Sequence, residues 1–151
     1  MAKISQQVRI NVPKNKVWEI LADFGSVSKW GPIVNQSALI SSSKQGVGTE
    51  RSCDIQQVGS VTEKAIEWDE GNGYTFELKG VESIKSMITK FSLSAEGDQT
   101  IITADTEFES AGGEAEQKGL EHMVQGSLKL IVQGLKQYAE TGQKMSPPPM
   151  P

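Results

Sequence analysis

The segment over residues 114–142 constrains this chain more than any other feature. Its apolar residues recur at helical spacing, which predicts one long amphipathic helix, and no strand pattern follows it. The preceding residues, 32–109, alternate between polar and apolar and are interrupted by glycine turns, as in short antiparallel strands. A sheet that wraps around a single helix tends to leave a cavity between the two. The sequence therefore favours an α+β fold that holds a small molecule.

The bulk properties exclude several classes of protein. With 151 residues, the chain is long enough for one domain, expected over 1–142 and followed by a disordered, proline-rich tail over 143–151. A net charge of -4 with scattered basic residues argues against a nucleic-acid partner. The single cysteine, the lack of a signal-peptide pattern and the lack of a spanning apolar run predict a soluble cytoplasmic protein. We expect a monomer.

The chain opens with an alternating segment over residues 3–12, which predicts a strand. Two short helices are expected next, over 14–24 and 27–30, with Gly25 ending the first and Ser26 capping the second. A turn is expected over 58–60, and the three glycines of the long helix suggest close packing or space left for a ligand. Six further strands are predicted, which complete a seven-stranded antiparallel sheet: residues 33–41, 49–56, 61–69, 74–79, 86–95 and 99–109.

Arg51 and Glu63 are the strongest candidates for chemistry. If the intervening hairpin turns near residue 57, the two side chains lie opposite each other on a face that is otherwise small or apolar. A charged pair in such a place must be matched to be tolerated. The pair would then act as proton donor and acceptor on a bound polar group. A purely structural ion pair gives the same pattern, and the sequence leaves both readings open.

The remaining candidates would line a pocket. Cavities are lined mostly by bulky apolar side chains with few polar groups. Glu67 is in phase with Glu63, although a solvated position is the simpler reading, and His122 is expected on the solvated helix face. Without a cluster of ligands around that histidine, no metal and no cofactor are expected. The candidate ligand-binding residues are Trp30, Arg51, Cys53, Glu63, Phe76, Met87, Phe91, Phe108, Met123 and Ser127.

Several segments resemble one known group of proteins. The sequence VWEILADF over residues 17–24, followed by SKWGP over 28–32, resembles the opening of the polyketide cyclase/dehydrase-like group in the START and Bet v 1-like superfamily. The segments 46–53 (GVGTERSC) and 62–69 (TEKAIEWD) are similar to its third and fourth strands. The resemblance covers residues 3–140 and implies the helix-grip fold. It leaves the function open, because this superfamily contains lipid carriers, hormone receptors, aromatases and lyases.

Within that superfamily, the chain is similar to plant lachrymatory factor synthase-like proteins. They share the Val-Trp-Glu helix, a Lys-Trp-x-Pro segment and a catalytic Arg and Glu on adjacent strands, which match Arg51 and Glu63 here. The loop between those strands is shorter in this chain. The resemblance implies a binder of a small hydrophobic or aromatic molecule, lipid-like or polyketide-like, or a cofactor-free cyclase, dehydratase or lyase. A protein-interaction module with a collapsed cavity is the third alternative.

Overall fold

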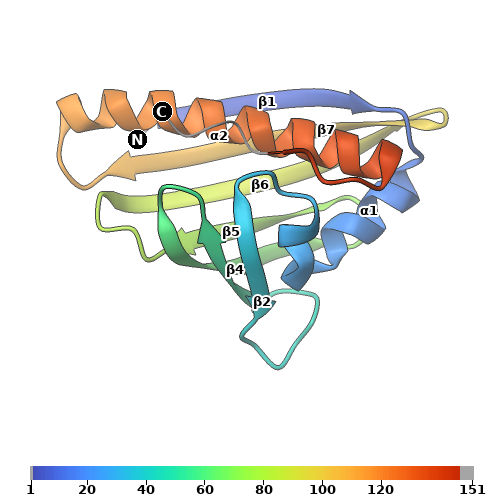
Figure 1. Cartoon of the computed structure of the whole chain (residues 1–151), viewed down its shortest axis with the longest axis horizontal. Coiled ribbons are helices and arrows are strands. Elements are labelled where there is room, and N and C mark those ends of the chain that lie inside the picture. Colours follow the sequence, from blue (N-terminus) through green and yellow to red (C-terminus); the bar gives the residue numbers. More distant parts are fainter. Residues whose placement is uncertain (1, 147–151) are drawn as a thin grey trace.

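The computed structural model describes residues 2–146 and shows a single curved sheet closed by a long helix (Figure 1). The seven strands are antiparallel and follow the order β1-β7-β6-β5-β4-β3-β2. The strands are β1 (Ala2–Ile10), β2 (Val34–Leu39), β3 (Glu50–Ile55), β4 (Gly59–Asp69), β5 (Gly73–Lys79), β6 (Ile84–Glu96) and β7 (Gln99–Ser110). The helices are α1 (Lys14–Ala22), the 3₁₀ helix η1 (Phe24–Lys29) and α2 (Glu114–Thr141).

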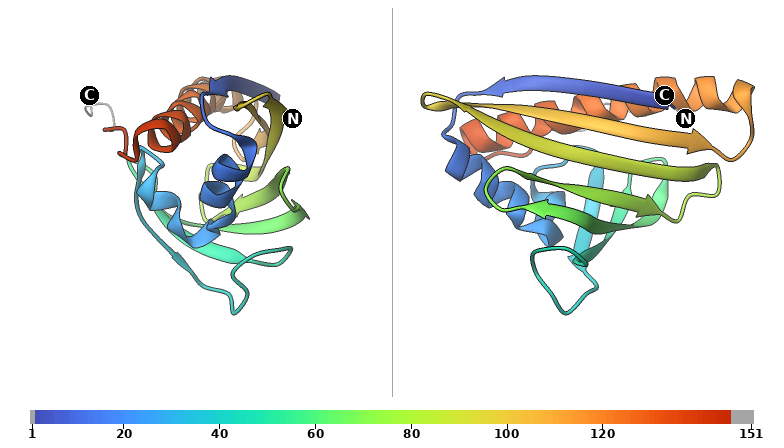
Figure 2. Two further views of the ribbon diagram at one scale, coloured as in Figure 1. Left: turned by 90° about the vertical axis from the view of Figure 1, so that its right-hand side faces the viewer. Right: turned by 180° about the vertical axis from the view of Figure 1, so that it is seen from behind.

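Successive hairpins build the sheet from β2 to β7. Strand β1, the first in the chain, completes the sheet by pairing with β7. Inward-facing residues of β6 and β7 alternate with outward-facing polar ones, so one face of the sheet is apolar. Figure 2 shows that this face curves around α2 while α1 and η1 close one end. The predicted α+β helix-grip fold is thereby confirmed.

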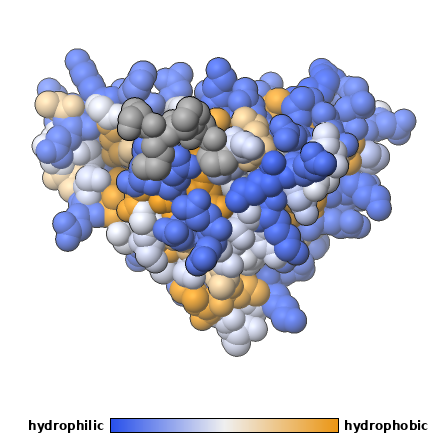
Figure 3. All heavy atoms as spheres, in the orientation of Figure 1, coloured by the Kyte–Doolittle hydropathy of each residue, from blue (hydrophilic) through white to orange (hydrophobic). Residues whose placement is uncertain are grey.

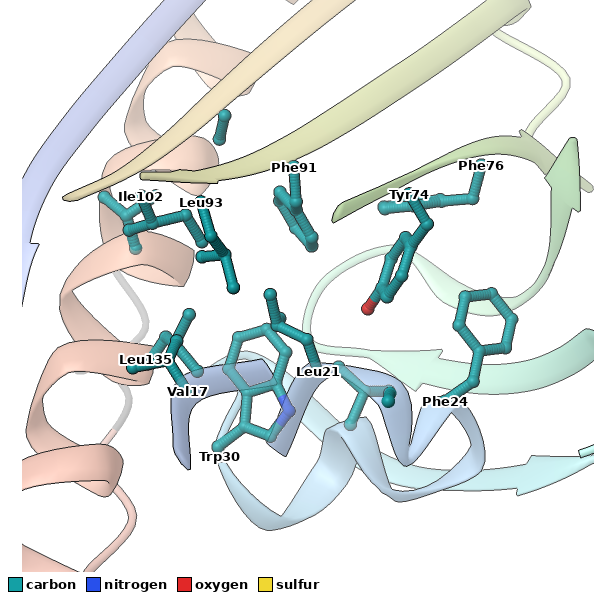
Figure 4. Packing of buried hydrophobic residues seen from close by; sticks show 14 of the residues in the cluster. Val17, Leu21, Phe24, Trp30, Tyr74, Phe76, Phe91, Leu93, Ile102 and Leu135 are labelled. Carbon is teal, nitrogen blue, oxygen red and sulfur yellow. The ribbon is translucent and has the colours of Figure 1, made fainter. Parts of the chain in front are cut away.

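The apolar interior divides into two clusters. The larger one packs α1, η1 and the C-terminal half of α2 against the sheet, and includes Trp30 and Phe91 (Figure 4). The smaller one lies under the N-terminal part of α2 and consists of Phe108, Leu120 and Val124. Between them, α2 carries the small, half-buried Ser127, and the interior is not filled by one continuous core.

The buried side of α2 differs partly from the predicted apolar stripe. The predicted stripe comprises Leu120, Met123, Val124, Ser127, Ile131, Leu135 and Tyr138. Leu128 and Val132 lie outside it and are buried, whereas Met123 is 45% exposed. At Gly134, helix α2 lies close to the segment that follows η1. An added Cβ there would be 2.4 Å from Pro32 Cδ and 3.0 Å from the Trp30 carbonyl oxygen. This contact explains one of the three helix glycines, while the same Cβ at Gly119 would meet nothing within 4 Å.

The boundaries near the two tight turns differ from expectation. Helix α1 ends at Ala22, and Gly25 lies inside η1, where an added Cβ would be 2.6 Å from Leu39 Cγ. Ser26 does not cap a separate helix but is a kink within η1. The β3–β4 turn comes earlier than predicted, because Gln57 adopts a positive φ of 68° and β4 already begins at Gly59.

A bulge in β4 reverses which side chains face the interior. The pairing with β5 shifts between Ala65 and Glu67, which places Glu67 on the exposed side. Trp68, the next residue, is half-buried and stacks on Tyr74 with ring centroids 5.1 Å apart. Strict alternation fails here because a bulge adds one residue to only one of the paired strands.

Residues 143–146 continue from α2 along the start of β2. Lys144 Nζ donates a hydrogen bond to the Val34 carbonyl oxygen at 2.8 Å, and burial lowers the pKa of this lysine. The rest of the expected disordered tail, residues 147–151, lies outside the described residues. Within residues 2–146, no helix is both long and apolar enough to cross a membrane.

Replacing Gly134 with alanine tests the close contact of α2. We expect Gly134→Ala to lower the free energy of unfolding by about 1–3 kcal/mol, because the added methyl group overlaps Pro32 and a backbone carbonyl. The matched control is Gly119→Ala in the same helix, which should raise it by about 0.5–1 kcal/mol through helix propensity. Urea unfolding measures both, and equal effects of the two variants would contradict the contact.

Candidate functional site

A cavity of about 110 Å³ lies between the concave face of the sheet and α2. It occupies the junction of the two apolar clusters, since Leu128 belongs to the larger one and Val124 to the smaller. Most of its wall is aliphatic, aromatic or thioether. The wall comprises Phe76, Leu78, Ile84, Met87, Val124, Leu128 and Ile131, with Ile33, Ile55, Val58, Val81 and Met123 and the polar residues Glu63, Thr89, Thr106 and Ser127.

The cavity continues into a groove at the surface. Val58 and Met123, which are 40% and 45% exposed, line both the cavity and the groove. The groove encloses about 320 Å³ beside Gly126 and Leu130 of α2. Figure 3 shows apolar surface between α2 and the β3–β4 hairpin on this side of the molecule. A small molecule could therefore enter between the hairpin and α2.

Glu63 of β4 is the only residue with a titratable side chain on the cavity wall formed by residues 2–146. Its Oε1 accepts hydrogen bonds from Arg51 Nε at 2.8 Å and from Cys53 Sγ at 3.7 Å. Among the described residues, none donates to Oε2. The carboxylate thus has one oxygen held by the protein and one available to a ligand.

Arg51 lies behind Glu63 and is away from the cavity wall. The two residues are direct partners across β3 and β4, which confirms the predicted register. Arg51 Nη1 also donates to the Phe24 carbonyl oxygen at 2.8 Å, and its Cζ lies 3.9 Å from the centroid of the Phe24 ring. The second ring is Phe76, at 5.1 Å. The guanidinium is therefore held by one carboxylate, one backbone carbonyl and two aromatic rings.

The charge of Arg51 is preserved despite its burial. Burial by itself lowers the pKa of the guanidinium, but Glu63, followed by Tyr74 and Cys53, raises it, and the net result is above the ordinary value. Burial also raises the pKa of the Cys53 thiol to about 12, and the neighbouring Glu63 contributes to the rise. The thiol is therefore protonated at neutral pH and is a poor nucleophile.

Tyr74 adds a buried hydroxyl beside this group. Its side chain packs edge-on against Phe24 at a centroid distance of 5.3 Å, and among the described residues its hydroxyl has no hydrogen-bond partner. Burial raises the pKa of the phenol. Tyr74 does not line the cavity between the sheet and α2, so this hydroxyl is part of the protein interior.

The structure places about half of the candidate ligand-binding residues on the cavity wall. Those on the cavity wall are Glu63, Phe76, Met87, Met123 and Ser127. The others lie elsewhere: Arg51 and Cys53 behind Glu63, Trp30 and Phe91 in the larger cluster (Figure 4), and Phe108 in the smaller one. Trp30, Phe91 and Phe108 are away from the wall because they pack against α1, η1 and the start of α2, which fill the two ends of the sheet. A ligand contact for any of the ten stays a prediction.

Two polar wall residues were missing from the candidates. Thr89 of β6 and Thr106 of β7 are cross-strand partners, and their hydroxyl oxygens lie 3.0 Å apart. The sequence offered one signal for Thr89. It alternates in step with Met87 and Phe91 and therefore faces the interior, where it is a polar residue in an apolar series. Within residues 2–146, no group of His, Cys, Asp or Glu is arranged to hold a metal ion. His122 is exposed beside the groove.

Removing the guanidinium of Arg51 from the buried ion pair should destabilise the fold. We expect Arg51→Met to lower the free energy of unfolding by about 3–5 kcal/mol, because Glu63 and the Phe24 carbonyl would lose their buried donor. The control is Lys3→Met, which breaks the exposed ion pair with Glu107 and should cost no more than about 1 kcal/mol. Chemical denaturation followed by circular dichroism measures both, and similar losses would refute a buried role for Arg51.

The sequence matches the family described as "Polyketide cyclase / dehydrase and lipid transport" over residues 1–140. No protein with a curated description matches it. Among solved structures, it is similar to the Zhui aromatase/cyclase of a Streptomyces species, with a TM-score of 0.80, 14% identity and coverage of 92% of this chain and 93% of that one.

Two other solved structures show the same fold. A START superfamily protein from Mycobacterium smegmatis has a TM-score of 0.78 and 15% identity, covering 93% of this chain and 99% of that one. For Ara h 8.0201 the TM-score is 0.74 and the identity 17%, with 91% and 97% covered. Because the family match extends over nearly the whole described chain, the protein belongs to the polyketide cyclase/dehydrase and lipid transport family.

Proposed function

We propose that this protein binds a small hydrophobic or aromatic molecule in the cavity between the sheet and α2. The observation that carries the proposal is a largely apolar cavity with one available carboxylate oxygen, that of Glu63. Apolar walls supply non-directional affinity, and a few polar groups fix the orientation of a ligand. The presence of this cavity argues against the alternative of an interaction module with a collapsed interior.

The cavity volume limits what is fully enclosed. At about 110 Å³, it is somewhat smaller than a cavity of roughly 150 Å³ that accepts benzene. We therefore expect at most one ring, or an aliphatic group of that size, to enter the cavity, with its outer edge and any remainder of the ligand in the surface groove. Burying about 150 Å² of apolar surface contributes roughly 4 kcal/mol before the entropic cost of association, so a single ring should bind with a Kd of about 1 mM or weaker.

Toluene is a suitable first probe, because it is apolar and consists of one ring. We expect its titration to shift the methyl resonances of Met87 and Met123 saturably in the millimolar range, since both residues line the cavity. Ser127→Phe should weaken binding at least tenfold by filling the cavity from α2. Gln125→Phe places the same ring on the exposed side of this helix and should bind like the unaltered protein. Unchanged binding to Ser127→Phe would exclude this cavity.

A cofactor-free cyclase, dehydratase or lyase is the second candidate. It is favoured by the available oxygen of Glu63 and by the structural similarity to an aromatase/cyclase. In this reading Glu63 moves a proton on the bound molecule. Arg51 does not reach the wall, so it is a positioning residue that holds the carboxylate and does not touch a developing oxyanion.

Glu63→Gln separates catalysis from binding. For any compound that the protein converts, we expect this variant to lose at least a hundredfold in kcat, because an amide does not accept the proton, while binding of the toluene probe is retained. Product formation measured beside the methyl titration distinguishes the two effects. An unaltered pH–rate profile in the variant would rule out proton transfer by Glu63.

We infer that the protein is cytoplasmic and monomeric, and that its ligand is lipid-like or polyketide-like. The unpaired Cys53 supports a reducing compartment. The family supports a hydrophobic ligand.

A further inference from the structure

We propose that the cavity selects a neutral molecule with a hydroxyl group that donates a hydrogen bond, and that it rejects carboxylates such as fatty acids. The proposal rests on the proposed function and names the class of ligand. It follows from which half of the Arg51–Glu63 pair reaches the cavity. The accessible half is the anion.

The cation is unavailable to a ligand. Arg51 Nε and Nη1 are directed at the Glu63 carboxylate and the Phe24 carbonyl, at 2.8 Å each. Its Cζ faces the rings of Phe24 and Phe76 at 3.9 and 5.1 Å, and the side chain is only 2% exposed. No lysine, arginine or histidine lies on the cavity wall formed by the described residues. An anionic ligand therefore finds no positive partner inside.

The available oxygen of Glu63 defines what binds next to it. An ionised carboxylate only accepts hydrogen bonds, so Oε2 requires a donor from the ligand. A hydroxyl or phenol supplies that donor while remaining neutral. A carboxylate would be desolvated beside a like charge, which disfavours its ionised form.

Thr89 and Thr106 provide a second polar point on the same wall. Their hydroxyl oxygens are 3.0 Å apart, so one donates to the other. The proton of the accepting hydroxyl is then free for a ligand oxygen. Glu63 is on β4 and Thr89 on β6, two strands apart, which separates their backbones by roughly 10 Å. A ligand with a hydroxyl at one end and a carbonyl or ether oxygen at the other would satisfy both points.

Three ligands with the same methylphenyl ring test the selection. Toluene, p-cresol and p-toluate are titrated at pH 7 into the full chain, with the methyl resonances of Met87 and Met123 as the readout. We expect p-cresol to bind at least tenfold tighter than toluene, because a hydrogen bond to a charged group is worth about a factor of ten or more. The carboxylate p-toluate should bind at least tenfold more weakly than toluene.

Two carboxylate variants of β4 identify the group responsible. Glu63→Gln keeps the size of the side chain but removes its charge, so the preference for p-cresol over toluene should fall below threefold and the rejection of p-toluate should weaken. Glu67→Gln is the matched control, because Glu67 is on the same strand but exposed and off the cavity wall. This control should keep the full preference.

Each outcome of the titrations is decisive. If toluene binds and p-cresol binds no tighter, or if p-toluate binds as well as toluene, the selection is refuted while the ring-sized site stands. If none of the three shifts the two methionine methyl resonances, the proposed function fails and this inference fails with it. The comparison on the unaltered protein needs no variant, so a folding defect of Glu63→Gln would not leave the question open.

Discussion

The buried guanidinium of Arg51 is the group around which the rest of the structure must be arranged. A charge in an apolar interior is tolerated only if it is matched, and Arg51 is matched by three elements at once. Glu63 of β4 supplies the counter-charge, the Phe24 carbonyl of η1 accepts a second hydrogen bond, and the rings of Phe24 and Phe76 cover its faces. This one side chain thereby ties η1 to strands β3 and β4 and orients the carboxylate that faces the cavity.

The cavity itself results from how one straight helix meets a curved sheet. Leu128, Val132 and Leu135 pack α2 onto the larger apolar cluster, and Leu120 and Val124 pack it onto the smaller one. Between these contacts the helix offers Ser127 and the sheet offers Thr89 and Thr106, which are too small to fill the space. The contact of Gly134 with Pro32 fixes the helix close to η1 at one end. The site is thus a gap between two well-packed regions.

The two members of the ion pair have different roles because only Glu63 reaches the cavity wall. The β3–β4 register places them opposite each other, but the longer Arg51 side chain turns toward η1, whereas Glu63 remains on the cavity wall. The cavity wall therefore presents an acceptor and not a cation. The protonated Cys53 thiol donates to the same carboxylate and offers no reactive thiolate of its own.

The sequence alone determined the architecture and the central pair. Alternation, glycine turns and one terminal apolar stripe were sufficient for an α+β fold with one antiparallel sheet and a long final helix, and the family resemblance implied its helix-grip form. Hairpin spacing was sufficient to set Arg51 opposite Glu63, because these patterns depend on neighbours in the chain. Only the tertiary structure decided which candidates reach the cavity. The β4 bulge turned Glu67 outward, the rotation of α2 buried Leu128, and the two apolar clusters took up Trp30, Phe91 and Phe108. Those outcomes depend on packing between segments far apart in the chain, which local periodicity does not encode.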